Sequence, residues 1–266
     1  MKFIIMITLL AFTACNGTVF SVQTKTVEYQ HEDKVMEGYL AYPDNLQEKR
    51  PAILVIHQWK GLGDYEKKRA EQLAELGYVA FAIDMYGKGI RPETSAEASK
   101  MAGKFRSDRE LMKARAKAGF DHIKEHTNVH PKKIAAIGYC FGGGVALELA
   151  RSGADLKGIV SFHGNLDTPN PEDAKNIQAE ILVCHGAEDP HVPWEQVTAF
   201  RKEMMQGDVN WQLNMYGNAV HSFTEKAAGD DPSDGVAYNK QAAERSWEAM
   251  KMLFKEVFSD NNNIKE

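Results

Sequence analysis

Short apolar runs alternate with segments of helical periodicity along most of the chain. Six runs are rich in apolar and β-branched residues and predict strands, the first five of them buried on both faces: 51–57, 78–84, 133–139, 158–164, 180–186 and 210–216. Apolar residues recur at helical spacing in the segments between them: 64–77, 107–126, 143–153 and 194–205. This alternation predicts an α/β fold with a mostly parallel central sheet and helices on both faces.

Two further patterns flank this alternating region. Residues 25–30 and 34–42 predict an N-terminal antiparallel hairpin. Residues 239–258 predict a long helix whose apolar stripe packs on the sheet; it consists of Ala243, Trp247, Met250, Phe254 and Val257. No repeat or linker divides the chain, so we expect one domain over residues 23–258 and a flexible tail over 259–266.

Residues 1–22 have the pattern of a secretory signal. One basic residue precedes an apolar run from Phe3 to Phe12, and small and polar residues follow. The run is shorter than the ~20 residues that a membrane span requires, and no other segment comes closer. The sequence "FTAC" also resembles a lipobox that would lipidate Cys15. We therefore expect an exported protein, periplasmic or secreted, with a lipid anchor at Cys15 as an open alternative.

Composition narrows the class of partner. The chain has 266 residues, 43% of them hydrophobic, with a formal charge of −5 and a pI near 6.0. This balance suits one large globular domain and lacks the basic blocks of a nucleic-acid-binding surface. A small-molecule substrate is the expectation.

Cys140 stands where an apolar run meets a string of glycines. The sequence Gly138-Tyr139-Cys140-Phe141-Gly142 fits the thiol form of the nucleophile elbow, a sharp turn between a strand and a helix. Side chains at the two glycines would collide with such a turn. The helix that follows directs its N-terminal dipole at the sulfur, which favours a thiolate. The alternative is a buried cysteine in a glycine-rich turn.

A nucleophile at an elbow needs a base and an acid, and both follow in the order that this arrangement requires. Asp189 follows one predicted strand, and His221 follows the next. We expect His221 to accept the Cys140 proton while Asp189 orients the imidazole, although a turn aspartate and a solvated loop histidine would give the same pattern.

An oxyanion hole is also expected near Cys140. The backbone N–H groups of Phe141 and Trp59 are the candidate donors. The remaining cysteine of the predicted domain, Cys184, lies inside an apolar run and is interpreted as a buried core residue rather than a disulfide partner.

These segments together resemble the dienelactone hydrolase family. The resemblance rests on "GYCFGGGVALELARSGADLKGIVSFHG", "VIHQWKGLGDY", "GYVAFAIDMYGKG", "HGAEDPHVP" and "HSF", and it covers nearly all of the predicted domain. It implies an α/β-hydrolase fold and a triad of Cys140, Asp189 and His221. It also implies hydrolysis of a carboxylic ester or lactone through an acyl-cysteine intermediate, without a metal or organic cofactor.

Three positions depart from the family pattern. Gln58 stands where the family has a glutamate, so the resemblance implies that Cys140 depends on His221 alone for activation. Lys88 aligns with one substrate-binding arginine, and Glu225 replaces a second. An anionic lactone should therefore bind less well, and dienelactone is not assigned as the substrate. We interpret Tyr86, Trp59, Phe141 and Phe223 as a pocket lining for an apolar or aromatic acyl group, with simple packing as the alternative.

Competing functions remain open at this point. A thioesterase or acyltransferase would use the same three residues, and an exported small-molecule binding protein would keep the fold without catalysis. Histidines recur near strand ends, but no metal-binding spacing organises them, so no metal site is expected. They are His57, His163, His185, His191 and His221.

Overall fold

The computed structural model describes residues 20–44 and 46–259. The predicted signal therefore lies mostly outside the described residues, as do Cys15 and residues 260–266. No helix in the described ranges is both long enough and apolar enough to cross a membrane. The first strand begins at Val22, the last residue of the segment predicted as a signal.

A single eight-stranded sheet forms the centre of the described structure. The strands are β1 (Val22–His31), β2 (Lys34–Pro43), β3 (Arg50–Ile56), β4 (Val79–Ile83), β5 (Val129–Tyr139), β6 (Gly158–Phe162), β7 (Glu180–Gly186) and β8 (Trp211–Tyr216). Their spatial order is β1-β2-β4-β3-β5-β6-β7-β8. The β1–β2 hairpin is antiparallel and pairs antiparallel with β4. The six strands from β3 to β8 are parallel to one another. The expected mostly parallel sheet with an N-terminal hairpin is confirmed.

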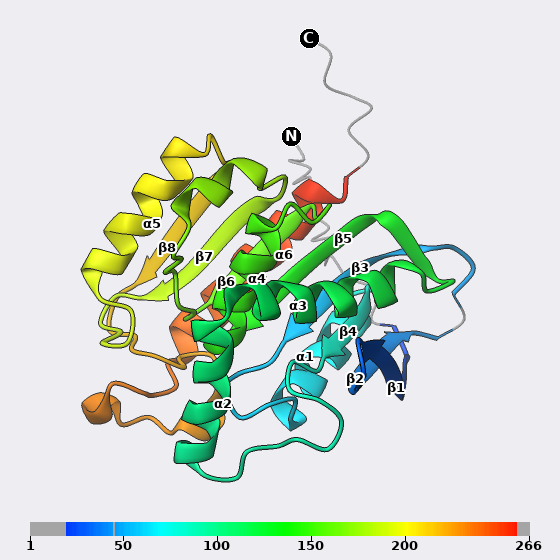
Figure 1. Cartoon of the computed structure of the whole chain (residues 1–266), viewed down its shortest axis with the longest axis horizontal. Helices are drawn as coiled ribbons and strands as arrows, with labels where there is room; N and C mark the ends of the chain where they lie inside the picture. Colours follow the sequence, from blue (N-terminus) through cyan, green and yellow to red (C-terminus); the bar gives the residue numbers. More distant parts are fainter. Residues whose placement is uncertain (1–19, 45, 260–266) are drawn as a thin grey trace, which may run out of the picture.

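Helices cover both faces of the sheet, as expected. Helices α3, α4 and α5 pack with one apolar cluster, and α1 and α6 pack with the other. Figure 1 shows α3 and α4 in front of the sheet and α6 behind it. The helices are α1 (Asp64–Glu75), α2 (Ser95–Ser107), α3 (Arg109–Lys124), α4 (Phe141–Arg151), α5 (Trp194–Gln206) and α6 (Lys240–Val257), with short 3₁₀ helices at Pro171–Asn176, Lys226–Ala228 and Pro232–Asp234.

Helix α2 was not predicted from the periodicity. It buries only three of its residues, Ala98, Ala102 and Phe105, so its apolar stripe is weak. A local signal is present nevertheless. The Thr94 hydroxyl accepts from the N–H of Glu97, and the Glu97 carboxylate accepts from the N–H of Thr94. This capping box starts a helix where the hydrophobic pattern does not reveal one.

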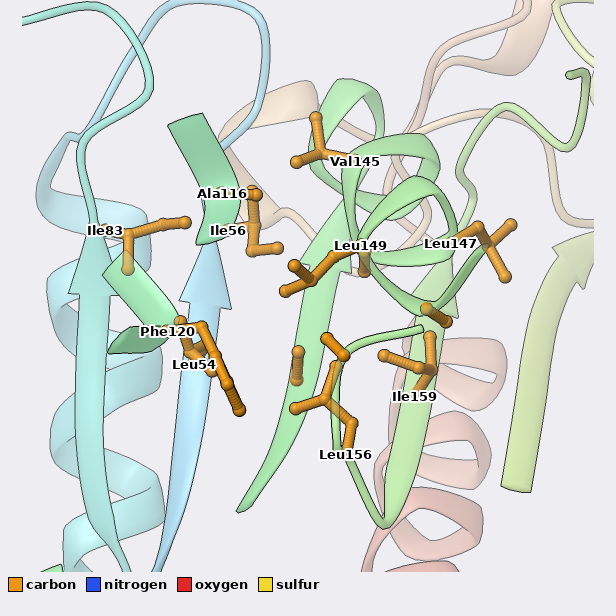
Figure 2. Close-up of a cluster of buried hydrophobic side chains, with 14 of the residues drawn as sticks. Leu54, Ile56, Ile83, Ala116, Phe120, Val145, Leu147, Leu149, Leu156 and Ile159 are labelled. Carbon is orange, nitrogen blue, oxygen red and sulfur yellow. The ribbon is translucent and has the colours of Figure 1, made fainter. Parts of the chain in front are cut away.

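The larger core cluster lies between the parallel strands and helices α3 and α4. Figure 2 shows Leu54 and Ile56 of β3 together with Phe120 of α3 and Leu149 of α4, all of them buried. Because α4 is buried along its whole length, it cannot move without disturbing the sheet. Its N-terminus, which follows Cys140, is therefore held firmly against the ends of the strands.

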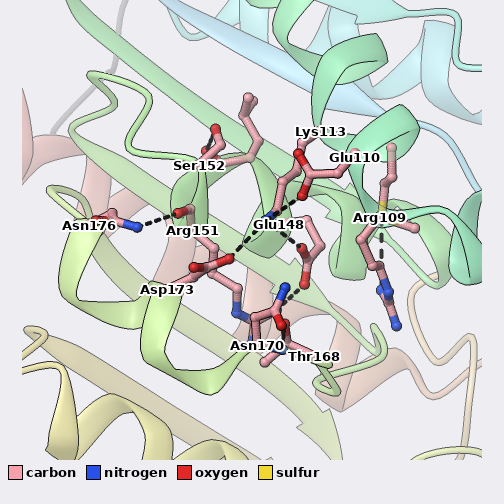
Figure 3. A network of polar contacts seen from close by, with 12 residues as sticks. Arg109, Glu110, Lys113, Glu148, Arg151, Ser152, Thr168, Asn170, Asp173 and Asn176 are labelled. Carbon is pink, nitrogen blue, oxygen red and sulfur yellow. Dashed lines mark hydrogen bonds and ion pairs between the residues drawn. The ribbon is translucent and has the colours of Figure 1, made fainter.

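A buried ionic network anchors the other end of α4. Arg151, which is fully buried, donates to both carboxylate oxygens of Glu203 at 2.7 and 2.8 Å, to Glu148 at 3.0 Å and to the Leu166 carbonyl at 3.1 Å. Lys113 of α3 extends the network to Asp173 at 2.8 Å (Figure 3). The network therefore joins α3, α4, α5 and the Pro171–Asn176 turn through charge-assisted hydrogen bonds.

Candidate active site

Cys140 occupies the turn between β5 and α4. Its backbone has φ 52° and ψ −117°, a left-handed conformation that is rare for a residue other than glycine. Its N–H donates to the Phe162 carbonyl at 3.1 Å, which ties the turn to the neighbouring strand β6. Strain of this kind persists only where the surrounding structure enforces it, and it collects at functional sites.

The two glycines of the elbow are required by backbone contacts. A Cβ at Gly138 would lie 1.9 Å from the Gly142 carbonyl oxygen, and a Cβ at Gly142 would lie 2.2 Å from the Ile56 carbonyl oxygen. These neighbours are main-chain atoms of the sheet and the elbow, so they cannot rotate away. The predicted steric role of the glycines is confirmed by these distances.

Gly142→Ala is expected to destabilise the fold by about 3 kcal/mol or more, since overpacking against fixed backbone has no cheap relief. Thermal unfolding monitored by circular dichroism measures the loss. Gly103→Ala in α2 is the matched control, because a methyl group on its Cα would meet no atom within 4 Å. The control should gain about 0.5–1 kcal/mol from helix propensity. Equal stability of the Gly142→Ala variant and the parent would contradict the steric argument.

His221 and Asp189 meet beside the elbow. Asp189 follows β7, His221 follows β8, and their side chains are joined by a hydrogen bond of 2.8 Å between Nδ1 and Oδ2. The other Asp189 oxygen accepts from the N–H of His191 at 2.8 Å, which fixes the carboxylate. The His221 backbone is held by Gly235 and Ala237 through hydrogen bonds of 3.0 Å each. Both side chains are buried, so the pair is rigid and largely shielded from water.

The charge state of His221 follows from these neighbours. Burial lowers the pKa of His221, but hydrogen bonds to the Asp189 carboxylate and to the Cys140 sulfur outweigh burial and raise the pKa to about 10. The imidazolium is thus the favoured form at neutral pH. The positive charge of His221 therefore lies next to the Cys140 sulfur.

The raised pKa of His221 also predicts how stability depends on pH. Its folded-state pKa lies above the unfolded value near 6.5, so its contribution is complete below about pH 6.5 and is lost as pH rises toward about 10. Urea unfolding across this window should show the free energy of unfolding falling in the parent and falling less in His221→Asn. Identical pH profiles for the two proteins would contradict the assignment.

The loop after β3 and the start of α4 each contribute one of the predicted oxyanion donors. Within the described ranges, the N–H groups of Trp59 and Phe141 have no hydrogen-bond acceptor. Phe141 is the first residue of α4, where the helix leaves its N–H groups unsatisfied. The hydrogen bonds of the described fold thus use neither of the two N–H groups that were predicted for an oxyanion hole.

Two side chains that were not predicted hold this loop in place. Glu66, only 2% exposed, accepts from the N–H of Gln58 at 3.2 Å and from the N–H of Gly63 at 3.0 Å. Burial raises the pKa of Glu66. Arg91 donates its Nε to the Leu62 carbonyl at 2.6 Å. Both residues are distant in sequence from the elbow, and no local pattern in the sequence marked them as supports of this loop.

Tyr86, predicted as a pocket-lining residue, is buried next to the loop after β3 and does not line the cavity there. Its hydroxyl donates to the Trp59 carbonyl at 2.8 Å, and its ring packs 5.9 Å from the Phe141 ring. Tyr86 and Phe141 are both almost completely buried, so these rings pack against the site from the interior of the protein. Trp59 is partly exposed and lines a cavity beside the loop.

Lys88 and Phe223 have surroundings that differ from the predicted substrate contacts. The Lys88 side chain forms an exposed ion pair of 2.5 Å with Glu28 of β1. Phe223 is fully buried in the second core cluster, 5.2 Å from the His163 ring and 5.5 Å from the Tyr216 ring. These contacts lie at the hairpin and in the core, and neither residue lines the cavity beside the loop, which is lined by Arg91.

Gln58 and Glu225, both singled out in the sequence, contact one another. The Gln58 amide donates to the Glu225 carboxylate at 2.9 Å across a sequence separation of 167 residues. Both residues line the same cavity of about 700 Å³ as Trp59 and Ser222, the residue after His221. A carboxylate is therefore present beside the site, supplied by Glu225 instead of position 58.

The other cysteine and the histidines have structural surroundings. Cys184 is fully buried in β7, where burial raises the pKa of its thiol to about 12, and its predicted core position is confirmed. His163 is buried, and its Nε2 hydrogen-bonds to Thr224 at 2.8 Å. Across residues 20–44 and 46–259, no group of three or more acidic, histidine or cysteine side chains is arranged to hold a metal.

Comparison with known proteins places this geometry in a family. The sequence model of the Dienelactone hydrolase family matches residues 36–258. A probable 2-oxo-3-(5-oxofuran-2-ylidene)propanoate lactonase from Bradyrhizobium sp is 30% identical over 220 residues, which cover 79% of this chain and 85% of the relative. Two solved structures each cover 90% of this chain and 99% of their own. One, named m3DLH, is 40% identical with a TM-score of 0.86. The other, a dienelactone hydrolase-like promiscuous phosphotriesterase, P91, from metagenomic libraries, is 39% identical with a TM-score of 0.84.

Proposed function

This chain belongs to the dienelactone hydrolase family and is a carboxylic ester hydrolase, and we propose that it cleaves an ester or lactone through an acyl-cysteine formed on Cys140. The observation that carries the proposal is the strained Cys140 turn beside the His221–Asp189 pair. A buried structural cysteine would need neither the left-handed backbone nor a charged imidazole beside it.

The proposed first step forms the acyl-enzyme. The Cys140 thiolate attacks the carbonyl carbon, and the developing oxyanion accepts hydrogen bonds from the N–H groups of Trp59 and Phe141. When the intermediate collapses, the C–O bond to the alcohol breaks and the His221 imidazolium gives its proton to the leaving oxygen. For a lactone, the alcohol remains attached to the acyl chain.

The second step restores the enzyme. Neutral His221 takes a proton from a water molecule, whose oxygen attacks the thioester carbonyl and releases the acid. The sulfur leaves as a thiolate beside the newly formed imidazolium, which is the charge state that the raised pKa of His221 favours. Asp189 holds the imidazole in one orientation through both steps.

Trapping the intermediate tests the proposal directly. The reduced protein is mixed with a short p-nitrophenyl ester, quenched in acid within the first turnover and digested. Mass spectrometry should find the acyl group on the peptide that carries Cys140, together with a burst of p-nitrophenol. Turnover with no acylated Cys140 peptide and no burst would argue against a covalent cysteine intermediate.

Two related activities would use the same groups. An acyltransferase or thioesterase differs only in which molecule attacks or leaves the acyl-cysteine, and adding alcohol acceptors to the trapping assay would detect transfer. The 39% identity to a protein described as a promiscuous phosphotriesterase supports a side activity on neutral phosphotriesters. The exported binding-protein alternative predicts no turnover of any of these substrates.

Export is a separate part of the proposal and is supported by the N-terminal sequence pattern. The apolar run after Lys2 and the lipobox-like "FTAC" favour passage across a membrane, with Cys15 as a lipid acceptor. Expression in a bacterial host should give a processed protein outside the cytoplasm. Palmitate labelling that disappears in Cys15→Ser would establish the anchor, whereas an unprocessed cytoplasmic protein would contradict export.

A further inference from the structure

Three carboxylates line the cavity beside the candidate triad, and the proposed chemistry uses none of them: Asp64, Glu66 and Glu225. Glu66 accepts from two N–H groups of the loop and Asp64 lies 3.5 Å from Lys67, which leaves Glu225. Glu225 lies four residues after His221, on the segment that leads out of the site, and lines the same cavity as Trp59. Its Oε2 accepts from the Gln58 amide at 2.9 Å, and its Oε1 has no partner among the described residues. A free carboxylate oxygen thus lines the space next to the expected oxyanion donors.

The segment around Glu225 is rigidly held. The hydroxyl of the preceding residue, Thr224, is 2.7 Å from the Tyr65 hydroxyl and 2.8 Å from His163 Nε2. The Thr224 carbonyl accepts from Arg69 Nη2 at 3.0 Å, and the Glu225 N–H donates to the Ser222 carbonyl at 2.9 Å. Since these contacts fix the backbone leading into Glu225, its side chain is a preorganised charge rather than a mobile surface acid.

The cationic side chains that line the cavity are either bonded to other protein groups or exposed to solvent. Arg91 is bound by the Leu62 and Ile90 carbonyls and lies 3.7 Å from Asp84. Lys67 lies 3.5 Å from Asp64. Lys60 is exposed to solvent, where its charge is screened. The Gln58 amide is neutral, so the charge of Glu225 is left uncompensated by a direct ion pair among the described residues.

From this arrangement we propose that Glu225, positioned by Gln58, selects esters and lactones that present a positive charge or a neutral hydrogen-bond donor, and rejects those that present a carboxylate. The inference rests on the proposed hydrolysis at Cys140. A cationic or N–H-bearing group gains a charge-assisted contact with the free Glu225 oxygen, whereas a substrate carboxylate is repelled by it.

Three p-nitrophenyl esters of one chain length test the selectivity; their acyl chains end in a trimethylammonium group, a tert-butyl group or a carboxylate. The readout is the ratio of kcat/KM for the cationic ester to that for the anionic ester. The parent should prefer the cation, Glu225→Gln should lower the ratio about tenfold, and Glu225→Lys should invert it. Glu256→Gln removes the same charge near the C-terminal end of α6, beside Glu180 at the start of β7, and should leave the ratio within about twofold.

Each outcome has a distinct meaning. Hydrolysis that requires Cys140, with the same ratio in the parent, Glu225→Gln and Glu225→Lys, overturns the selectivity and leaves the proposed function intact. If the parent hydrolyses none of the three esters, both the proposed function and the proposed selectivity are overturned. Should the Glu225 variants fail to fold, the parent alone decides: its cation preference must shrink when sodium chloride is added, and a ratio unaffected by salt overturns the selectivity.

Discussion

Cys140→Ala should lower kcat/KM for a p-nitrophenyl ester by roughly 10⁴-fold to 10⁶-fold, as expected for removal of a nucleophile whose base cannot act without it. The variant should remain folded, because alanine keeps the small size of the residue and the glycines around it are unchanged. Activity is followed by p-nitrophenol release, and folding is checked by thermal denaturation.

Cys184→Ala is the matched control for this loss. It also removes a buried thiol, but from within β7, where the Tyr216 hydroxyl lies 3.8 Å from the sulfur. Its thiol stays protonated at neutral pH, since burial raises its pKa to about 12. The control should lose about 1 kcal/mol of stability and keep its kcat. Hydrolysis at the parental rate in Cys140→Ala would move the chemistry to another residue.

Arg151→Met is expected to cost about 3–5 kcal/mol of folding free energy, because it leaves the Glu203 carboxylate buried without its cation and Glu148 with only Lys113 at 3.9 Å. Burial raises the pKa of Glu203 even with Arg151 present. In the variant, Glu203 should favour its neutral form, so the loss should be smaller at pH 5 than at pH 8. Urea unfolding at the two pH values measures the difference.

A double variant separates the charge from the packing. Arg151→Met with Glu203→Met replaces the closest ion pair by apolar side chains, and it should be more stable than Arg151→Met alone. A double variant that is less stable than either single variant would show that packing around the guanidinium, and not the orphaned charge, dominates the loss.

Much of the fold was predictable because its signals are local. Each parallel strand is a nearly continuous apolar run, and the elbow is marked by Gly138 and Gly142 around Cys140. The order of Asp189 and His221 after successive strands predicted that both lie at one edge of the sheet, and the 2.8 Å hydrogen bond shows that they meet. Parallel strands leave little freedom in where their carboxyl ends lie.

What escaped prediction depends on contacts between distant segments. Lys88 and Arg91 are three residues apart, and no local pattern indicates that the first pairs with the hairpin while the second lines the cavity. Phe223 lies two residues after His221, yet it faces the core. The Gln58–Glu225 contact spans 167 residues, so neither position alone indicates that an amide and a carboxylate adjoin.

The close backbone approaches around α4 bear on how this scaffold can change over time. Cys140, the proposed nucleophile, is located by main-chain contacts, including the sites at Gly138 and Gly142 where no side chain fits. Glu225, in contrast, is located by side chains on α1 and after β6 that point substitutions can exchange one at a time. Substrate preference is therefore the trait that drifts most readily in such a lineage, while the position of the sulfur is inherited almost unchanged.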